Sequence, residues 1–375
     1  MCRVTGRCDL HHSPQRLCKS SAGPRRLRPG VPVRYSPRVI PFEPHPRLEN
    51  PHWMTLAGRF WPRSLTRLPA GVERYFKVEP GIRLLAHCHW QEQGSERPAL
   101  VLVHGLEGSS DSRYLLGTAE KAWVAGFHVV RMNQRNCGGT EALAPTLYNS
   151  GLSGDYRAVV RTLAEADGLK EVFLAGFSMG GNLVLKAAGE FGSEAASRSI
   201  GPAFAGVAAV CPALDLAACV DAIHEPRNAF YERYFVRNLI KRYRRKVSLF
   251  PQHFKLDGVD RVRTIREFDD WITAPYCGYG NAVNYYDRAS AKHVLGAIAV
   301  PGLVITAQDD PMVPHDSVRR PELLANMHFT LLNPEHGGHC AFISRHGGGD
   351  ERFWAECRIV EFCAAQSKLL GKREE

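Results

Sequence analysis

The sequence predicts an α/β fold in which a mostly parallel sheet carries helices on both of its faces. Short apolar segments alternate with longer segments that have a helical period. The short segments are apolar throughout, which is typical of strands buried on both faces of a parallel sheet. The expected strands are residues 82–90, 99–104, 127–132, 172–177, 204–211, 302–306 and 328–332, and the expected helices are residues 114–125, 153–166, 181–188 and 352–364.

Composition and charge fit a globular protein and give no sign of a nucleic-acid partner. The 375 residues are 44% hydrophobic and 23% charged, with a formal net charge of +10. Residues 1–40 alone hold nine Arg or Lys against the single acid Asp9, which accounts for +8 of that charge. The rest of the chain is therefore nearly neutral. The sequence has no uninterrupted run of about 18 apolar residues, so it predicts no transmembrane helix.

The cysteines and the N-terminus predict a cytoplasmic protein with reduced thiols. The 11 cysteines are scattered and form no C-x-x-C pair, which disfavours zinc ribbons and thioredoxin chemistry. The first residues, MCRVTGRC, lack the apolar stretch of a secretory signal. We therefore expect free thiols, with no metal ion and no organic cofactor.

Changes in composition divide the chain into three parts. Residues 1–45 are rich in Pro and Arg and predict an irregular, basic lead-in. The α/β core is expected to comprise residues 46–212 and 298–375. Residues 213–297 interrupt the alternation of strands and helices, which predicts a lid over the carboxyl edge of the sheet, where open α/β folds place their sites.

Residues 230–247 of this insertion predict an amphipathic helix. One face carries Tyr231, Phe235, Leu239 and Tyr243, and another carries Arg233, Arg237, Lys241 and Arg245. Docking on an anionic lipid surface is one interpretation of this pattern. A solvated lid helix is the interpretation that we favour.

The segment of residues 172–181, VFLAGFSMGG, predicts a nucleophilic serine. It reads as an apolar strand, then the pattern G-x-S-x-G, then the start of a helix. The turn is so sharp that the serine takes a strained conformation and its neighbours must be glycine. We therefore expect Ser178 to stand above the sheet at a helix N-terminus, where developing negative charge is favoured.

A serine needs a base, and the base needs an orienting acid, in the chain order Ser, acid, His. The acid is expected just after the strand of residues 302–306, where Asp309 and Asp310 compete. We favour Asp310, directly before a proline, and expect Asp309 to cap the following helix.

The base is expected on the loop after the last strand, where His336, His339 and His346 are candidates. We favour His339, because the preceding glycines let the loop reach back towards Ser178. His336 and His346 read as exposed loop histidines. A metal site on His336 and His339 is disfavoured because no further ligands complete it.

An oxyanion hole needs two backbone N–H groups. Met179, directly after the nucleophile, should supply one of them, and Leu106, in the loop HGLEGS of residues 104–109, should supply the other. His104 precedes this loop and is expected to brace it through hydrogen bonds. Cys137 is expected to be a buried structural thiol.

Further motifs follow one another in a specific order along three quarters of the chain. They are residues 104–109, the Arg135–Gly138 turn, Gly176–Gly181, residues 266–270, Gly278-Tyr279, Tyr285-Tyr286, Ser290, Pro301, Asp309-Asp310 and Gly337-Gly338-His339. With these motifs the chain resembles the YheT-like branch of the α/β hydrolases, which is related to the ABHD esterases and lipases. Asn136 and Asn284 depart from that family's pattern, and Asn tolerates the left-handed backbone that the turn at residue 136 requires.

The resemblance implies hydrolysis of carboxylic esters, with short-chain or lipid-like acyl groups as substrates. The expected reaction is a two-step acyl transfer to water through a Ser178–Asp310–His339 triad, without cofactor or metal. An acyltransferase on the same fold and a non-catalytic ligand-binding protein are the alternatives. Residues 266–270 are expected to anchor the lid to the core.

Overall fold

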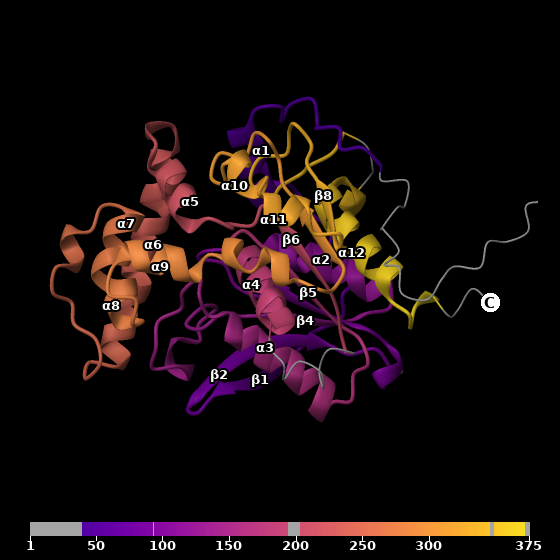
Figure 1. Ribbon diagram of the computed structural model, residues 1–375, viewed down its shortest axis with the longest axis horizontal. Helices are drawn as coiled ribbons and strands as arrows, with labels where there is room; N and C mark the ends of the chain where they lie inside the picture. Colours follow the sequence, from indigo (N-terminus) through magenta and orange to yellow (C-terminus); the bar gives the residue numbers. More distant parts are fainter. Residues whose placement is uncertain (1–39, 93, 194–202, 346–348, 372–375) are drawn as a thin grey trace, which may run out of the picture. The chain divides into compact units, whose positions relative to one another are not determined.

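The computed structural model describes residues 40–92, 94–193, 203–345 and 349–371 (Figure 1). Within this part the chain forms an eight-stranded sheet in the order β1-β2-β4-β3-β5-β6-β7-β8. The strands are β1 (Val72–Glu79), β2 (Ile82–His89), β3 (Ala99–Val103), β4 (His128–Met132), β5 (Val172–Phe177), β6 (Phe204–Val210), β7 (Gly302–Ile305) and β8 (Phe329–Leu332). Residues 1–39 of the expected lead-in and the candidate base His346 lie outside the described residues.

The helices follow the strands in the alternation that the sequence predicts. They are α1 (Pro51–Phe60), α2 (Arg113–Val124), α3 (Ser153–Arg161), α4 (Met179–Ser193), α5 (Leu216–His224), α6 (Ala229–Leu249), α7 (Ile265–Phe268), α8 (Ala274–Tyr276), α9 (Ala282–Ala289), α10 (His315–Val318), α11 (Pro321–Leu324) and α12 (Trp354–Gln366). Short π-helical turns extend α3 at Thr162–Ala166 and α7 at Asp269–Thr273. The 3₁₀ turns are Gly94–Glu96, Glu141–Leu143, Pro226–Asn228, Val259–Arg261, Ala291–His293, Leu295–Ala297 and Gly349–Arg352.

The register of the sheet brings the ends of its central strands to one edge. Strands β3 to β8 are parallel, whereas β1 and β2 extend the sheet in antiparallel fashion. Val103 is paired with Gly176, and Phe177 is paired with Val210. The loops after β3, β5 and β6 therefore start side by side, at the carboxyl edge where open α/β sheets hold their sites.

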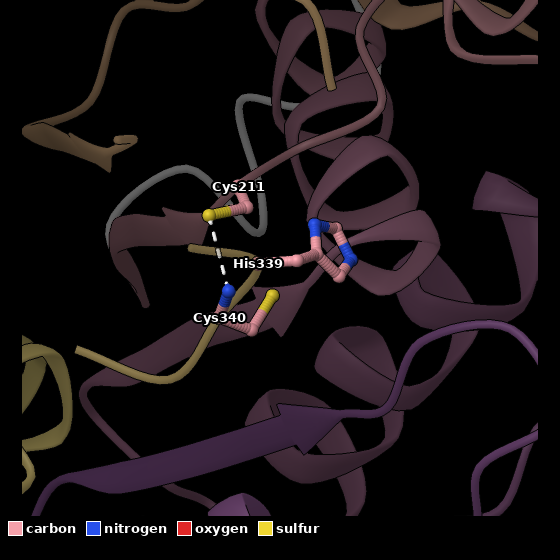
Figure 2. Close-up of side chains that lie close together, drawn as sticks. All are labelled: Cys211, His339 and Cys340. Carbon is pink, nitrogen blue, oxygen red and sulfur yellow. Dashed lines mark hydrogen bonds between the residues drawn. The ribbon is translucent and has the colours of Figure 1, made fainter. Parts of the chain in front are cut away.

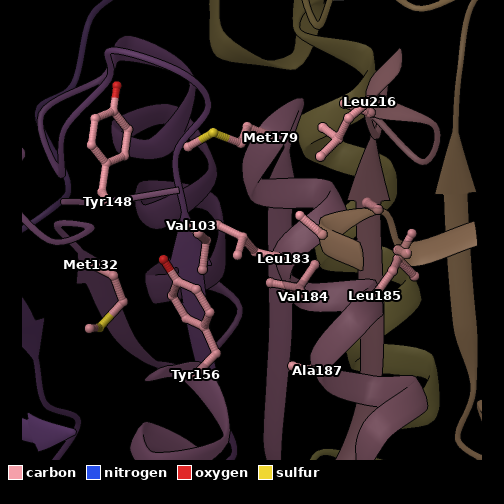
Figure 3. Packing of buried hydrophobic residues seen from close by; sticks show 14 of the residues in the cluster. Val103, Met132, Tyr148, Tyr156, Met179, Leu183, Val184, Leu185, Ala187 and Leu216 are labelled. Carbon is pink, nitrogen blue, oxygen red and sulfur yellow. The ribbon is translucent and has the colours of Figure 1, made fainter. Parts of the chain in front are cut away.

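Two apolar clusters, one on each face, hold the sheet between its helices. Within β3 the side chains alternate, so that Val101 and Val103 join one cluster while Leu100 and Leu102 join the other. Figure 3 shows Val103 close to Tyr156 of α3 and Leu183 of α4 on the first face. The second cluster packs against α2 and α12. The central strands are thus buried on both faces, which explains why β3, β5, β6 and β7 are apolar throughout.

Two elements near the start of the described chain were not expected from the sequence. Helix α1 begins at Pro51, after Asn50, whose side chain accepts hydrogen bonds from the His52 and Trp53 amides. Strand β1 is an edge strand on which only Phe76 is buried. Its mixed polar sequence lacks the continuous apolar run of the inner strands.

Residues 40–45, which the sequence assigns to the irregular lead-in, are bonded to the last part of the chain. The Trp354 indole N–H donates to the Ile40 carbonyl over 2.7 Å. The His45 amide donates to the Ile343 carbonyl over 3.0 Å, and Pro44 bridges to Ser344. Residues 40–45 therefore contact the α/β core through these bonds.

The insertion between β6 and β7 is helical, as expected, and contains α5 to α9 (Figure 1). On α6, Tyr231, Leu239 and Tyr243 are buried and Phe235 is half-buried, while Arg233, Arg237, Lys241 and Arg245 are exposed. The apolar face of α6 therefore packs inward and is not presented to a surface. Among the described residues, no helix is both long and apolar enough to cross a membrane.

Candidate active site

Ser178 lies in the sharp turn that joins β5 to α4. Its φ angle is 54°, in the left-handed region that side chains rarely occupy. A Cβ atom on Gly176 would lie 2.2 Å from the Gly180 carbonyl oxygen, and one on Gly180 would lie 2.4 Å from the carbonyl oxygens of Val103 and His104. Both glycines of the G-x-S-x-G pattern are thus required by close backbone approach.

The structure brings the three favoured candidates, Ser178, His339 and Asp310, into one hydrogen-bonded chain. His339 Nε2 lies 2.9 Å from Ser178 Oγ. On the other side of the ring, Nδ1 lies 2.9 Å and 3.1 Å from the two carboxylate oxygens of Asp310. This is the geometry in which a base can take the serine proton while an acid fixes the imidazole.

Asp310 is held in place by the backbone that follows it. Its side chain is fully buried, and Oδ1 accepts hydrogen bonds from the amides of Met312 and Val313 at 2.8 and 3.0 Å. Burial alone would lower the pKa of His339, but the charge and hydrogen bond of Asp310 outweigh it and raise that pKa above its ordinary value. The carboxylate therefore stabilises the imidazolium.

Asp309 has a different role from the one expected. It accepts the Gly338 amide over 2.9 Å and contacts His336 Nδ1 at 3.2 Å. The helix that follows, α10, has Pro314 at its N-cap and no side-chain cap, so the expected capping by Asp309 is wrong. Asp309 instead fastens the turn that carries His339. His336 is partly exposed and does not reach Ser178.

Helix α1 also positions the base. The His339 amide donates to Thr55 Oγ1 over 2.9 Å, and a Cβ atom on Gly338 would lie 2.7 Å from the Pro51 carbonyl oxygen. This contact was not expected from the sequence, because helix α1 was not expected. The Asn-Pro pair at residues 50 and 51 was the available signal for an N-terminus there.

The loop after β3 runs alongside Ser178, where the oxyanion hole was expected. A Cβ atom on Gly105 would lie 3.1 Å from Ser178 Cβ. Met179 is the first residue of α4, so its amide has no acceptor within the helix. For the Leu106 amide, no backbone acceptor is found in the described part of the chain. Both N–H groups are thus available beside the nucleophile.

His104 braces this loop, as expected. Its Nδ1 bonds the Gly105 carbonyl at 2.7 Å, and its Nε2 accepts the Gln134 amide at 3.2 Å. Burial lowers the pKa of His104 to about 4, so the ring is neutral and can both donate and accept. Cys137 is fully buried in the core, also as expected.

Two thiols lie next to the base, as Figure 2 shows. The Cys340 amide donates to Cys211 Sγ over 3.3 Å, and the donor atoms of Cys211, His339 and Cys340 all lie within 4.8 Å of one another. Burial raises the pKa of the Cys211 thiol well above its usual range, which keeps it neutral. Because both ring nitrogens of His339 already bond Ser178 and Asp310, neither is left for a metal ion.

Two cavities meet at Ser178. One is apolar and lies between the insertion and the core, with Leu216, Val220, Ile223, Leu239, Phe268 and Tyr285 in its wall. The other is an open groove between α1, the loop after β3 and α6. His339 and Leu106 line both cavities, so a bound molecule can extend from the reacting centre in two directions.

Comparison with known proteins agrees with this fold. A family profile described as the alpha/beta hydrolase fold matches residues 98–345. YheT of Escherichia coli (strain K12), named as a candidate esterase, is 32% identical over 330 residues, which cover 86% of this chain and 92% of YheT. The monoacylglycerol lipase of Saccharomyces cerevisiae is 28% identical over 289 residues, covering 74% of this chain and 62% of the lipase.

A further relative and a solved structure are also similar to this chain. Phospholipase ABHD3 of Mus musculus is 28% identical over 258 residues, covering 66% of this chain and 59% of the phospholipase. The crystal structure of the 2,6-dihydroxy-pseudo-oxynicotine hydrolase shares the fold, with a TM-score of 0.54 and 16% identity over 86% of this chain and 73% of that one. The chain therefore belongs to the α/β-hydrolase fold family and, within its esterase and lipase group, to the YheT-like branch.

The glycines of the turn at Ser178 give a stability prediction. Gly180→Ala should prevent correct folding, because the new Cβ would meet two backbone oxygens that cannot move aside. Gly154→Ala, in α3, would place a Cβ atom in ordinary contact with the end of the Arg157 side chain at 3.7 Å, and should be neutral or stabilising by about 0.5–1 kcal/mol. Urea unfolding of both variants measures the difference. Equal stability of the two would contradict the close packing described for the turn.

Proposed function

We propose that this protein hydrolyses carboxylic esters through an acyl-enzyme on Ser178. The observation that carries the proposal is the hydrogen-bonded chain from Ser178 Oγ through His339 to the buried Asp310, with both distances at 2.9 Å. The esterase and lipase relatives support the same bond class. The strained conformation of Ser178 also supports the proposal, because strained backbone persists only where the surrounding structure enforces it and is concentrated at functional sites.

In the first step His339 takes the proton of Ser178 as the serine oxygen attacks the ester carbonyl. The Leu106 and Met179 amides hold the oxyanion that forms, and Asp310 stabilises the imidazolium. His339 then gives its proton to the leaving alcohol, which breaks the ester bond. In the second step water attacks the acyl-enzyme by the same route, and the acid and a free serine are released.

The two cavities suggest how an ester is placed. The acyl chain enters the apolar pocket and the alcohol part lies in the open groove, because the pocket offers apolar side chains and the groove is more polar. In this proposal residues 213–297 form a lid over the acyl pocket, and residues 46–212 and 298–375 form the core. The cytoplasmic location stays a prediction from the sequence.

The nucleophile is tested with Ser178→Ala. Hydrolysis of p-nitrophenyl butyrate and covalent labelling by a fluorophosphonate probe should both be lost, because no other activated oxygen replaces the serine. The variant should keep the thermal midpoint of the wild type. Labelling that persists in a folded Ser178→Ala protein would show that another residue is the nucleophile.

Added ethanol during turnover distinguishes hydrolysis from acyl transfer, since a transferase would form the ethyl ester.

The acid is tested by comparing Asp310→Asn with Asp309→Asn. Asp310→Asn should lower kcat about 10⁴-fold, because the imidazole loses its orientation and its stabilising charge. Asp309→Asn should have a much smaller effect, since Asp309 contacts His336 and Gly338 instead. A larger loss in the Asp309 variant would reverse the assignment.

The same pair has a pH signature. The base works when neutral, and Asp310 raises the pKa of His339. Activity of the wild type should therefore fall as the pH drops through a value above 6.5, the ordinary pKa of histidine. In Asp310→Asn the residual activity should fall at a lower pH, because the charge that raises the pKa of His339 is absent. An unshifted kcat/KM profile would contradict a direct Asp310–His339 interaction.

The acyl pocket is tested with Ile223→Trp. The larger side chain should fill part of the pocket, so kcat/KM for long-chain p-nitrophenyl esters should fall at least about tenfold while that for the acetate ester changes little. The matched control is Val283→Trp, at an exposed position outside the pocket, which should leave the series unchanged. A parallel loss for all chain lengths would place the acyl chain elsewhere.

A further inference from the structure

Glu107 has a backbone conformation that normally belongs to glycine. The Gly108 amide bonds the Gly105 carbonyl at 3.1 Å, which closes a turn around Leu106 and Glu107. Glu107 is the third residue of this turn and has a φ angle of 57°. Glycine or asparagine is the usual residue at a left-handed third position. A glutamate at this position therefore needs side-chain contacts that stabilise its left-handed backbone.

The Glu107 carboxylate is bound by a partly buried arginine and a buried tyrosine. Arg242 donates Nε to Oε1 over 3.1 Å and Nη2 to Oε2 over 3.0 Å, and the Tyr148 hydroxyl donates to Oε1 over 2.5 Å. Only 4% of the Glu107 side chain is exposed. A two-pronged arginine–carboxylate contact fixes direction as well as distance. The turn of residues 105–108 is thus held by its third residue.

The same guanidinium holds a second strained turn. Arg242 Nη1 donates to the carbonyl of Asn136, whose φ angle is 65°. Arg242 belongs to α6 of the insertion, whereas Glu107 and Asn136 follow β3 and β4 of the core. One side chain of the insertion therefore fixes two left-handed turns at the carboxyl edge of the sheet.

The turn of residues 105–108 is the one that carries the Leu106 amide. Its first residue approaches Ser178 so closely that a Cβ atom on Gly105 would lie 3.1 Å from Ser178 Cβ. A small rotation of the turn would change the direction of the Leu106 N–H relative to the serine oxygen. Donors in an oxyanion hole act through their fixed direction, so such a rotation weakens transition-state binding.

We propose that Arg242 is a positioning residue, which holds Glu107 and thereby aims the Leu106 amide at the oxyanion. The proposal rests on the proposed ester hydrolysis by Ser178. The geometry of the oxyanion hole then depends on the packing of α6 against the core. Arg242 lines both cavities at Ser178, but in this proposal it acts through Glu107 and not by contact with the substrate. Neither residue was singled out by the sequence, because the pair spans 135 positions of the chain.

The first test is Arg242→Met, which keeps an apolar stem and removes the charge. With p-nitrophenyl butyrate, kcat should fall about 10- to 100-fold while KM changes little, because the defect appears only in the transition state. A trifluoromethyl ketone, which forms an oxyanion on the serine, should bind more weakly by the same factor as kcat/KM. Arg244→Met, on the same helix but paired with the exposed Asp260, is the control and should match the wild type.

The second test repeats Arg242→Met in a Glu107→Gly background. Glycine adopts the left-handed conformation without an anchor, so loss of Arg242 should there lower kcat by less than about threefold. This double variant also keeps the test open if Arg242→Met alone fails to fold. An equal loss of kcat in both backgrounds, or a rise in KM with kcat unchanged, would overturn the proposal. Wild-type protein without Ser178-dependent hydrolysis would instead refute the proposed function.

Discussion

Left-handed backbone at the carboxyl edge of the sheet is the constraint on which the site depends. Among the described residues, six that are not glycine have a positive φ angle: Glu107, Asn136, Ser178, Cys211, Cys340 and Phe342. The first four follow β3, β4, β5 and β6 within four residues, and the last two follow His339 within three residues. Each such residue costs about 1–3 kcal/mol and persists only where its surroundings enforce it. The strain is concentrated where the reacting groups meet.

The surroundings that enforce this strain come from three parts of the fold: the parallel strands, helix α1 and helix α6 of the insertion. The parallel strands supply the start of each loop, and their common register brings those loops together. Helix α1 bonds the His339 loop through Thr55, and α6 bonds the loops after β3 and β4 through Arg242. The cavity at Ser178 is thus bordered by the elements that also fix its geometry. In the proposed reaction, substrate placement and preorganisation of the site are therefore two results of one packing arrangement.

Much of the fold could be predicted because its strands are buried on both faces. Largely apolar runs located β2 to β8 to within about two residues, and the central strands β3, β5, β6 and β7 are apolar without interruption. Strand β1 was not predicted, because an edge strand with one buried residue has no continuous apolar run. The G-x-S-x-G pattern and the order of acid and histidine led to Ser178, Asp310 and His339, because those roles follow from local turns. Their catalytic roles stay proposals that the geometry supports.

Contacts between distant segments could not be predicted in the same way. The pairing of Arg242 with Glu107 and of Cys211 with Cys340 depends on how loops meet after folding. The helical period of α6 did identify its buried face, yet it gave no reason to single out Arg242 among the basic residues of that helix. Asp309 shows the same limit, because its partners Gly338 and His336 lie on a different loop.

In the proposed reaction, Ser178 attacks an ester whose oxyanion is held by the Leu106 and Met179 amides. This arrangement can be observed in a crystal structure of the wild-type protein after reaction with a phosphonate ester. We expect a phosphorus atom bonded to Ser178 Oγ, with one phosphonyl oxygen about 2.7–3.1 Å from both amide nitrogens. A phosphonyl oxygen turned away from both amides, or phosphorus on another residue, would contradict it.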